Sequence, residues 1–190
     1  SEYLKQKFKN RDFSYHNSRD CSFDNLYDAA KLIKQRGGKC IRMFSGEKNR
    51  LKLKYNKYII DYSTKWHSDF MDIYLPATCK FFLGGPSGLS EVSEIFNIPI
   101  AITNIVPACH LSIPKDSLFI PKLLYSYNEK KILGYRDINK KNLNNISNID
   151  HLKKLGIKFL ENDSDDIKLL AQDMLDNLNN IKLKKEEQNI

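Results

Sequence analysis

Hydrophobic residues recur along this chain with two different spacings, and segments of the two kinds alternate. Some segments carry apolar residues every three or four positions, which is the spacing of one face of an amphipathic helix. Others are short continuous apolar runs, which are typical of strands buried in a sheet. The helical segments are 23–37, 68–78, 88–97 and 164–181, and the strand-like segments are 39–44, 56–62, 79–84 and 99–104.

Strands that alternate with helices of about ten residues are typical of an α/β domain with a mostly parallel sheet. Residues 105–150 interrupt the alternation, because they contain three prolines and the polar stretch "NKKNLNNISNID". We expect this region to be irregular and to contain an exposed connection rather than a domain boundary. The pattern therefore predicts one domain over residues 1–190, with a Rossmann-like, mostly parallel sheet flanked by helices.

The stretch "CKFFLGGPSGLSEVSEIF" (79–96) predicts a strand, a tight turn and a helix. In open α/β sheets, ligands bind beyond the carboxyl ends of the strands, where helices begin. The glycines allow a close approach of the backbone, Ser87 can cap the helix, and the N–H groups near Gly88 and Leu89 suit a phosphate. Many strand–helix turns carry glycine and serine for geometry alone, so that alternative stays open. The turn matches neither a P-loop nor the dinucleotide-binding glycine pattern.

Charge and cysteine content narrow the class of protein. The net charge is +8 and the pI about 9.2, which suits an anionic partner such as nucleic acid, a phosphorylated ligand or an acidic membrane surface. Coding bias explains the lysines equally well, because they are scattered along the chain. The four cysteines form no C-x-x-C pair and the four histidines show no metal-ligand spacing. These features predict reduced thiols in a cytoplasmic protein, and no apolar run is long enough to cross a bilayer.

Several segments, in order, resemble a bacterial family of glycosyltransferases with the GT-B superfold. They are "FSYHNSRDCSFDNLYDAAKLIKQRGGKCIRM", "IIDYSTKWHSDFMDIYLPATCKFFLGGPSGLSEVSEIFNIPIAITN", "FIPKLL", "ILGYRDI" and "LGIKFLENDSDDIKLLAQDML", and together they cover nearly the whole chain. A more distant similarity joins residues 71–88 to the donor-binding half of fucosyltransferase-like enzymes. The resemblance implies the C-terminal, donor-binding half of a GT-B enzyme, which transfers a sugar from a nucleoside-diphosphate sugar and generally needs no metal or other cofactor.

The resemblance also implies roles for individual residues. Ser87, Gly88 and Leu89 are expected to hold the diphosphate, and Asp72 is expected to contact the base or ribose. Arginine suits a diphosphate because its planar fork binds two oxygens at once. The candidates to supply the positive charge that neutralises the diphosphate are Arg19, Arg42 and, more weakly, Lys122.

Each of these residues also has a structural alternative. Asp72 could face solvent, Arg19 could pair with Asp20 or Asp24, and Lys122 could be structural or solvated. No catalytic residue is assigned, although Asp61, His67 and Asp69 are candidates for a general base.

Differences from the family pattern qualify the resemblance. Family members open with an apolar strand that ends in an arginine-containing motif, and an N-terminal region supplies the acceptor side. Since this sequence begins at Ser1, we expect a fragment that lacks both. Phe44 replaces a family glycine after "RM", and Val92 stands where retaining GT-B enzymes often place a glutamate.

The expected partners are a nucleotide-sugar donor and a glycan or lipid-linked acceptor, in surface polysaccharide synthesis. The expected location is the cytoplasm, with peripheral association at the inner face of the membrane as an option. Alternative functions are a non-catalytic nucleotide-binding module, a sugar-nucleotide epimerase and a basic nucleic-acid binder. The last has no recognition motif, so no specific nucleic acid is expected.

Overall fold

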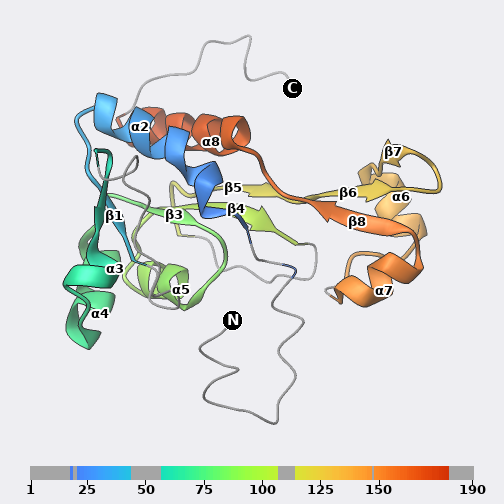
Figure 1. Ribbon diagram of the computed structural model, residues 1–190, viewed down its shortest axis with the longest axis horizontal. Coiled ribbons are helices and arrows are strands. Elements are labelled where there is room, and N and C mark those ends of the chain that lie inside the picture. The colour runs from blue at the N-terminus through green and yellow to red at the C-terminus, as the bar shows by residue number, and fades with distance from the viewer. Residues whose placement is uncertain (1–17, 19–20, 44–56, 107–113, 147, 180–190) are drawn as a thin grey trace.

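The structure is a computed structural model that describes residues 18, 21–43, 57–106, 114–146 and 148–179. In this part, parallel strands with helices above and below them form a body, and residues 123–160 form a lobe at one end (Figure 1). We use the names body and lobe in this sense throughout. None of the described helices is both long and apolar enough to span a bilayer.

The strands of the body are parallel. β1 (Cys40–Arg42) pairs with β2 (Ile59–Asp61), and β4 (Ile100–Ile105) lies between β3 (Phe82–Gly84) and β5 (Leu118–Pro121) in a second sheet. Because β3, β4 and β5 run in the same direction, their carboxyl ends lie at one edge of that sheet, which we call the carboxyl edge. The predicted α/β fold with parallel sheets flanked by helices is confirmed, and it is compatible with a Rossmann-like fold.

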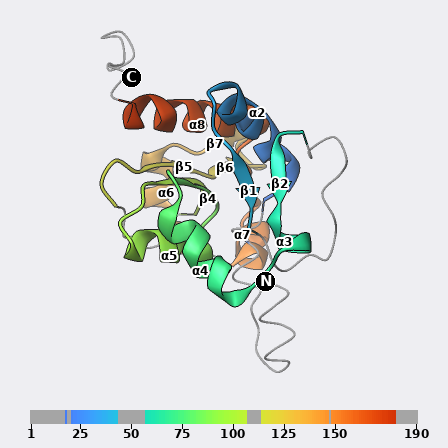
Figure 2. The same cartoon turned by 90° about the vertical axis from the view of Figure 1, so that its left-hand side faces the viewer.

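One face of the sheets is covered by two helices (Figures 1 and 2). The 3₁₀-helix η2 (Phe23–Leu26) leads into α2 (Tyr27–Gln35), which lies beside α8 (Ser164–Leu178). Small residues of α2 allow this close packing, and the shared core consists of Ala29, Ile33, Ile167, Ala171 and Leu175. The apolar spacing predicted for both helices is therefore the spacing of their buried faces.

Helices on the other face follow β2 and β3. α5 (Gly88–Ile95) follows β3, and α4 (Asp69–Thr78) packs beside it, with the Ser93 hydroxyl donating to the Pro76 carbonyl at 3.0 Å. A short helix α3 (Tyr62–Lys65) connects β2 to α4. The helix predicted over 68–78 is confirmed, but most of its apolar face is solvent-exposed: Phe70 is 72% exposed, Ile73 49% and Tyr74 48%.

The predicted irregularity of residues 105–150 is wrong. After β5 come β6 (Leu123–Ser126), β7 (Lys131–Ile132), α6 (Tyr135–Lys140) and α7 (Ile149–Lys154), and β8 (Ile157–Leu160) completes the lobe. β6 pairs antiparallel with both β7 and β8. The lobe has a core of its own, formed by Leu124, Leu133, Leu143, Leu152 and Ile157. Strands of two to four residues, separated by turns rich in Asn and Lys, are too short to give a periodic pattern in the sequence.

Burial of the Cys40 thiol predicts a specific loss of stability at alkaline pH. Cys40 lies against α2, and burial raises the pKa of its thiol from the usual 9.0 to about 11. The unfolded chain therefore loses this proton at lower pH than the folded chain, so the free energy of unfolding falls as the pH rises from about 9 to about 11. Urea unfolding across this range should show a shallower fall for Cys40→Ala than for the wild type. Parallel curves for the two proteins would contradict the assignment.

Candidate functional site

The turn between β3 and α5 presents backbone amides at the carboxyl edge. The Ser87 hydroxyl accepts a hydrogen bond from the Ser90 N–H at 3.3 Å, and the Ser90 hydroxyl accepts one from the Ser87 N–H at 3.0 Å. This reciprocal capping fixes the start of the helix. Among the described residues, no acceptor binds the N–H groups of Gly88 and Leu89, which belong to the same first turn.

No described residue covers the front of this turn. Ser87 and Gly88 are exposed, and a Cβ atom built on Gly88 meets no atom of the described residues within 4 Å. Neither Gly84 nor Gly88 has a positive φ, so the strained backbone that glycine often permits is absent at these two positions. Gly88 has no side chain, so a ligand can approach the backbone N–H groups at the start of α5 closely.

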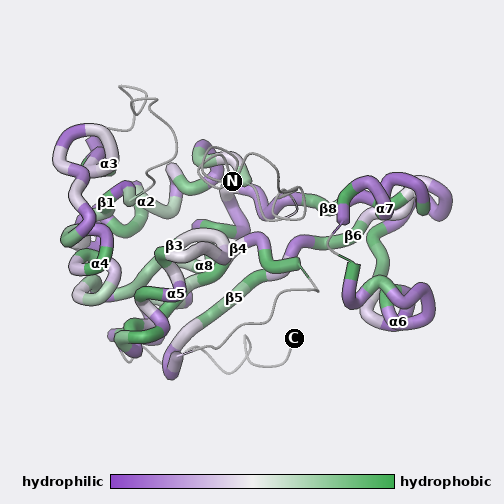
Figure 3. Tube along the Cα trace, turned by 90° about the horizontal axis from the view of Figure 1, so that it is seen from below, coloured by the Kyte–Doolittle hydropathy of each residue, from purple (hydrophilic) through white to green (hydrophobic). Residues whose placement is uncertain are grey.

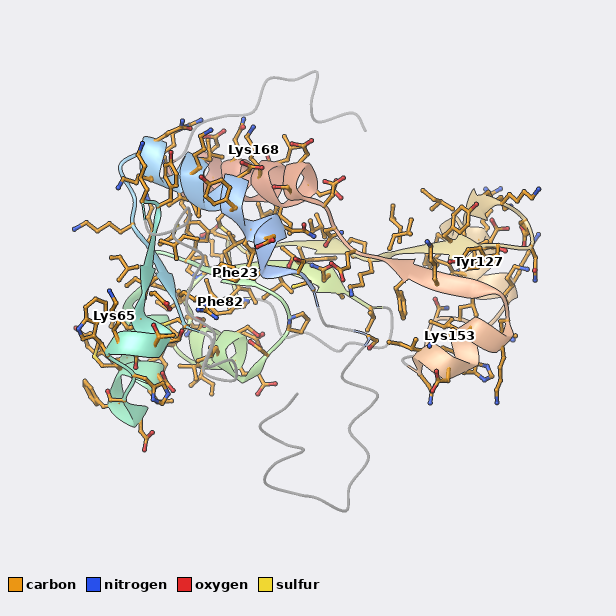
Figure 4. The ribbon with its side chains drawn as sticks, in the orientation of Figure 1. Phe23, Lys65, Phe82, Tyr127, Lys153 and Lys168 are labelled. Carbon is orange, nitrogen blue, oxygen red and sulfur yellow. The ribbon has the colours of Figure 1, made fainter. Side chains whose placement is uncertain are left out.

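Arg42, the last residue of β1, forms a buried ion pair with Asp61, the last residue of β2. The two are register partners, and an Arg42 guanidinium nitrogen lies 3.3 Å from an Asp61 carboxylate oxygen. The hydroxyls of Ser63 and Thr64 donate to the Asp61 carboxylate at 3.0 and 2.8 Å. The Arg42 guanidinium carbon also lies 5.3 Å from the centre of the Phe23 ring, which Figure 4 shows inside the body.

Asp72 is held by two side chains rather than facing open solvent. One carboxylate oxygen lies 3.1 Å from the Tyr62 hydroxyl, and the other lies 2.8 Å from the His67 Nε2. Tyr62 is only 3% exposed, and its hydroxyl also accepts from the Ser68 N–H at 2.9 Å. Two sets of polar contacts, one around Asp61 and one around Tyr62, are thus joined by the peptide bond between these adjacent residues, and we call the two sets together the α3 network.

The predicted site residues thus fall into separate groups. Ser87, Gly88 and Leu89 lie together at the β3–α5 turn, whereas Arg42 and Asp72 belong to the α3 network. Figures 1 and 2 place α3 and α4 at the outer end of the body, beyond β1 and β2, and α5 beneath β3 and β4. Lys122 is buried between β5 and β6, with its backbone N–H donating to the Ile105 carbonyl at 2.7 Å. Arg19 lies outside the described residues.

The candidates for a general base differ in their surroundings. Asp61 accepts from Arg42 and two hydroxyls, and one imidazole nitrogen of His67 is joined to Asp72. Asp69 is exposed in the first turn of α4, where its charge complements the helix dipole. No group of three His, Cys, Asp or Glu side chains in the described ranges is placed to hold a metal ion.

Sequence reasoning missed a pair of asparagines at the carboxyl edge. Asn104 is fully buried with a left-handed backbone (φ 58°), and its side-chain oxygen accepts from the Asn162 N–H at 3.0 Å. The Asn162 side-chain oxygen accepts from the Asn104 N–H in return, at 2.6 Å. Asparagine tolerates positive φ better than other residues with a side chain. An asparagine at the end of an apolar strand was therefore the available clue in the sequence.

Comparisons with protein-family models, with curated proteins and with solved structures found no match to this chain.

The Arg42–Asp61 pair predicts a large effect of removing one partner. Asp61→Ala leaves a buried guanidinium without this carboxylate, and breaking such a pair costs about 3–5 kcal/mol of unfolding free energy. Urea unfolding measures the loss. The matched control is Asp69→Ala, which removes an exposed aspartate and is expected to cost less than about 1 kcal/mol.

A double variant separates the effect of the unpaired charge from the effect of lost packing. Replacing both partners, as in Arg42→Met with Asp61→Leu, is expected to restore most of the stability lost in Asp61→Ala, because apolar replacements often substitute for buried pairs. Equal stability of Asp61→Ala and Asp69→Ala would mean that the pair is not buried as described.

Proposed function

We propose that this chain is the donor-binding part of a glycosyltransferase, binding a nucleoside-diphosphate sugar at the carboxyl edge. The observation that carries the proposal is the open first turn of α5, where the N–H groups of Gly88 and Leu89 lie at an exposed position. A helix N-terminus carries about half a positive charge, which favours a phosphate group there. The parallel strands supply the second support, since ligands of such sheets bind at the ends where helices begin.

In the proposed reaction, an acceptor hydroxyl attacks the anomeric carbon of the sugar while the bond to the diphosphate breaks. The nucleoside diphosphate leaves, and a base accepts the hydroxyl proton. Negative charge grows on the departing diphosphate, so donors aimed at it lower the barrier. Ser87, Gly88 and Leu89 would supply those donors without a metal ion, as in the GT-B enzymes that the sequence resembles.

The α3 network gives Asp72 a defined position for a second contact. Its carboxylate is fixed from one side by buried Tyr62 and from the other by His67, so it is pre-organised to accept a hydrogen bond. A carboxylate of this kind suits the donor groups of a ribose or a base.

A non-catalytic nucleotide-binding module is the second candidate. It is favoured by the Arg42–Asp61 pair, because the described arginine expected to neutralise the diphosphate is already paired with a carboxylate. A protein of this kind would bind nucleotides without hydrolysing or transferring the sugar. Donor hydrolysis, measured as release of nucleoside diphosphate from sugar conjugates, separates the two candidates.

Substitutions at Ser87 test the proposed site. Asp and Asn cap helices about as well as Ser, so Ser87→Asp and Ser87→Asn both keep α5 folded and differ from each other mainly in charge. We expect a nucleotide that stabilises the wild type to stabilise Ser87→Asn and to lose its effect on Ser87→Asp, whose carboxylate repels phosphate. Thermal unfolding with GDP, UDP, ADP and CMP conjugates measures this effect.

The expected size follows from ligand linkage. A ligand at a hundredfold excess over its dissociation constant stabilises the folded state by about 2.7 kcal/mol. An exposed lysine on α8, changed in Lys168→Ala, is the distant control that should leave the effect intact. Equal loss in Ser87→Asn and Ser87→Asp, or no stabilisation by any conjugate, would count against the proposed site.

A further inference from the structure

The lobe is positively charged because it contains few acidic residues. Residues 123–160 contain eight Lys and Arg residues against three Asp and Glu, which is a net charge of +5. This contiguous segment holds eight of the 31 basic residues of the sequence but only three of the 23 acidic ones. In Figure 3, the turns of α6 and α7 are largely hydrophilic.

Each acidic residue of the lobe forms an ion pair with a lysine. Lys131 lies 3.1 Å from both Glu129 and Asp137, Lys141 lies 2.8 Å from Glu129, and Lys153 lies 3.3 Å from Asp150. Hydrogen bonds from lysine lower the pKa of both Glu129 and Asp137, so these carboxylates stay charged and paired with lysine. The cations of the described lobe that form no ion pair with a described carboxylate are Lys130, Arg136, Lys140, Lys154 and Lys158, although Lys140 is close enough to Asp137 to help lower its pKa.

One face of the lobe sheet is open. Successive strand residues point to opposite faces. Buried Leu124 and its partly buried partner Phe159 therefore face the helices, while the neighbouring pair Tyr125 and Lys158 faces away from them. Ile132, the partner of Tyr125 on β7, is also on that side and 51% exposed. We call this surface the open face.

Two tyrosines and a lysine form the centre of the open face. The ring centres of Tyr125 and Tyr127 are 5.5 Å apart and nearly perpendicular. The Lys158 ammonium lies 5.7 Å from the first ring centre and 5.3 Å from the second. Tyr127 is 55% exposed, and Figure 4 shows it in the lobe, well away from Lys168 on α8. Flat aromatic surface therefore lies beside a cation that has no carboxylate partner among the residues that the structure describes.

The lobe extends from the carboxyl edge. β5 ends at Pro121 and β6 begins at Leu123, so a single residue separates the body strand from the lobe strand. β3 and β4 end at the same edge, and the open turn of α5 follows β3. The lobe thus projects from the end of the sheet where the proposed donor site lies (Figure 1).

We propose that the open face of the lobe binds an acidic glycan, as the acceptor of the reaction. The role of the glycan as an acceptor rests on the proposed function, whereas its acidic character is inferred from the residues of the lobe. Tyr127 provides an apolar surface for the carbon-bound hydrogens of a sugar ring, and Lys158 beside it attracts a carboxylate or other anionic group. The position at the carboxyl edge favours a glycan over other polyanions, because an acceptor must come close to the donor.

Charge reversal at Lys158 is the test. Binding of a fluorescent oligogalacturonate, which is a chain of acidic sugars, is compared with binding of a neutral glucan of matched length. Lys158→Glu is expected to weaken oligogalacturonate binding by about tenfold or more, as loss of a charge-assisted contact implies. Lys168→Glu makes the same charge change on α8 and is expected to alter it less than about twofold, because screening limits distant charges.

Aromatic contact is tested separately at Tyr127. Tyr127→Ala is expected to weaken binding, whereas Tyr127→Phe, which keeps the ring, retains most of it. Circular dichroism and the unfolding temperature of each variant show that the lobe remains folded, and Lys158→Glu still tests the proposal if Tyr127→Ala does not fold.

The outcomes separate this proposal from the proposed function. Absence of oligogalacturonate binding, or equal loss in Lys158→Glu and Lys168→Glu, overturns the acceptor surface even where nucleotide conjugates stabilise the protein. Tighter binding of oligouridylate, or of vesicles containing phosphatidylglycerol, overturns it in favour of a nucleic acid or a membrane. Glycan binding that depends on Lys158 without any response to nucleotides keeps the surface and removes the donor site.

Discussion

β4 is enclosed on both faces, and each residue from Ile100 to Ile105 is buried. Ile100 and Ile102 pack with Phe82, while Ala101 between them packs with Leu170 and Met174 of α8. Fully burying an isoleucine side chain contributes about 1.5–3 kcal/mol, so this short strand supplies a large part of the driving force for the body. A strand buried in this way must also satisfy its polar groups internally, because no water reaches them.

The end of β4 shows how that requirement shapes the carboxyl edge. Asn104 turns the backbone through a left-handed conformation, and Asn162 exchanges hydrogen bonds with it. Asn162 also donates to the Pro121 carbonyl at 2.9 Å and thereby joins β4, β5 and the start of α8. Polar groups at this edge thus largely satisfy one another, as they also do in the Arg42–Asp61 pair. The first turn of α5 differs, since its capping serines leave Gly88 and Leu89 amides facing an open approach.

Sequence patterns predicted the body well because its elements follow simple rules. Helices 27–35 and 164–178 bury one regular face, and β3 and β4 are apolar runs next to glycine or proline. The lobe was not predicted, because its strands are too short for periodicity and its core residues come singly from β6, α7, β8 and the segments between them. The Ser87 cap was predictable from local chemistry, whereas the contacts of Asp72 with Tyr62 and His67 were not. Those contacts depend on how α3 folds back on α4, which spacing alone does not reveal.

The connection between body and lobe bears on how donor and acceptor could meet. Two strands form this connection, since Leu123 of β6 pairs with Leu160 of β8 at its base. On the body side, Asn162 ties the chain after β8 to the Pro121 carbonyl at the end of β5. Lys122, between the two, is buried and its backbone N–H bonds to β4. A double-stranded, hydrogen-bonded base of this kind resists bending more than a single linker does. Under the two proposals above, an acceptor on the open face would therefore reach a donor at the α5 turn through its own length rather than by closure of the lobe.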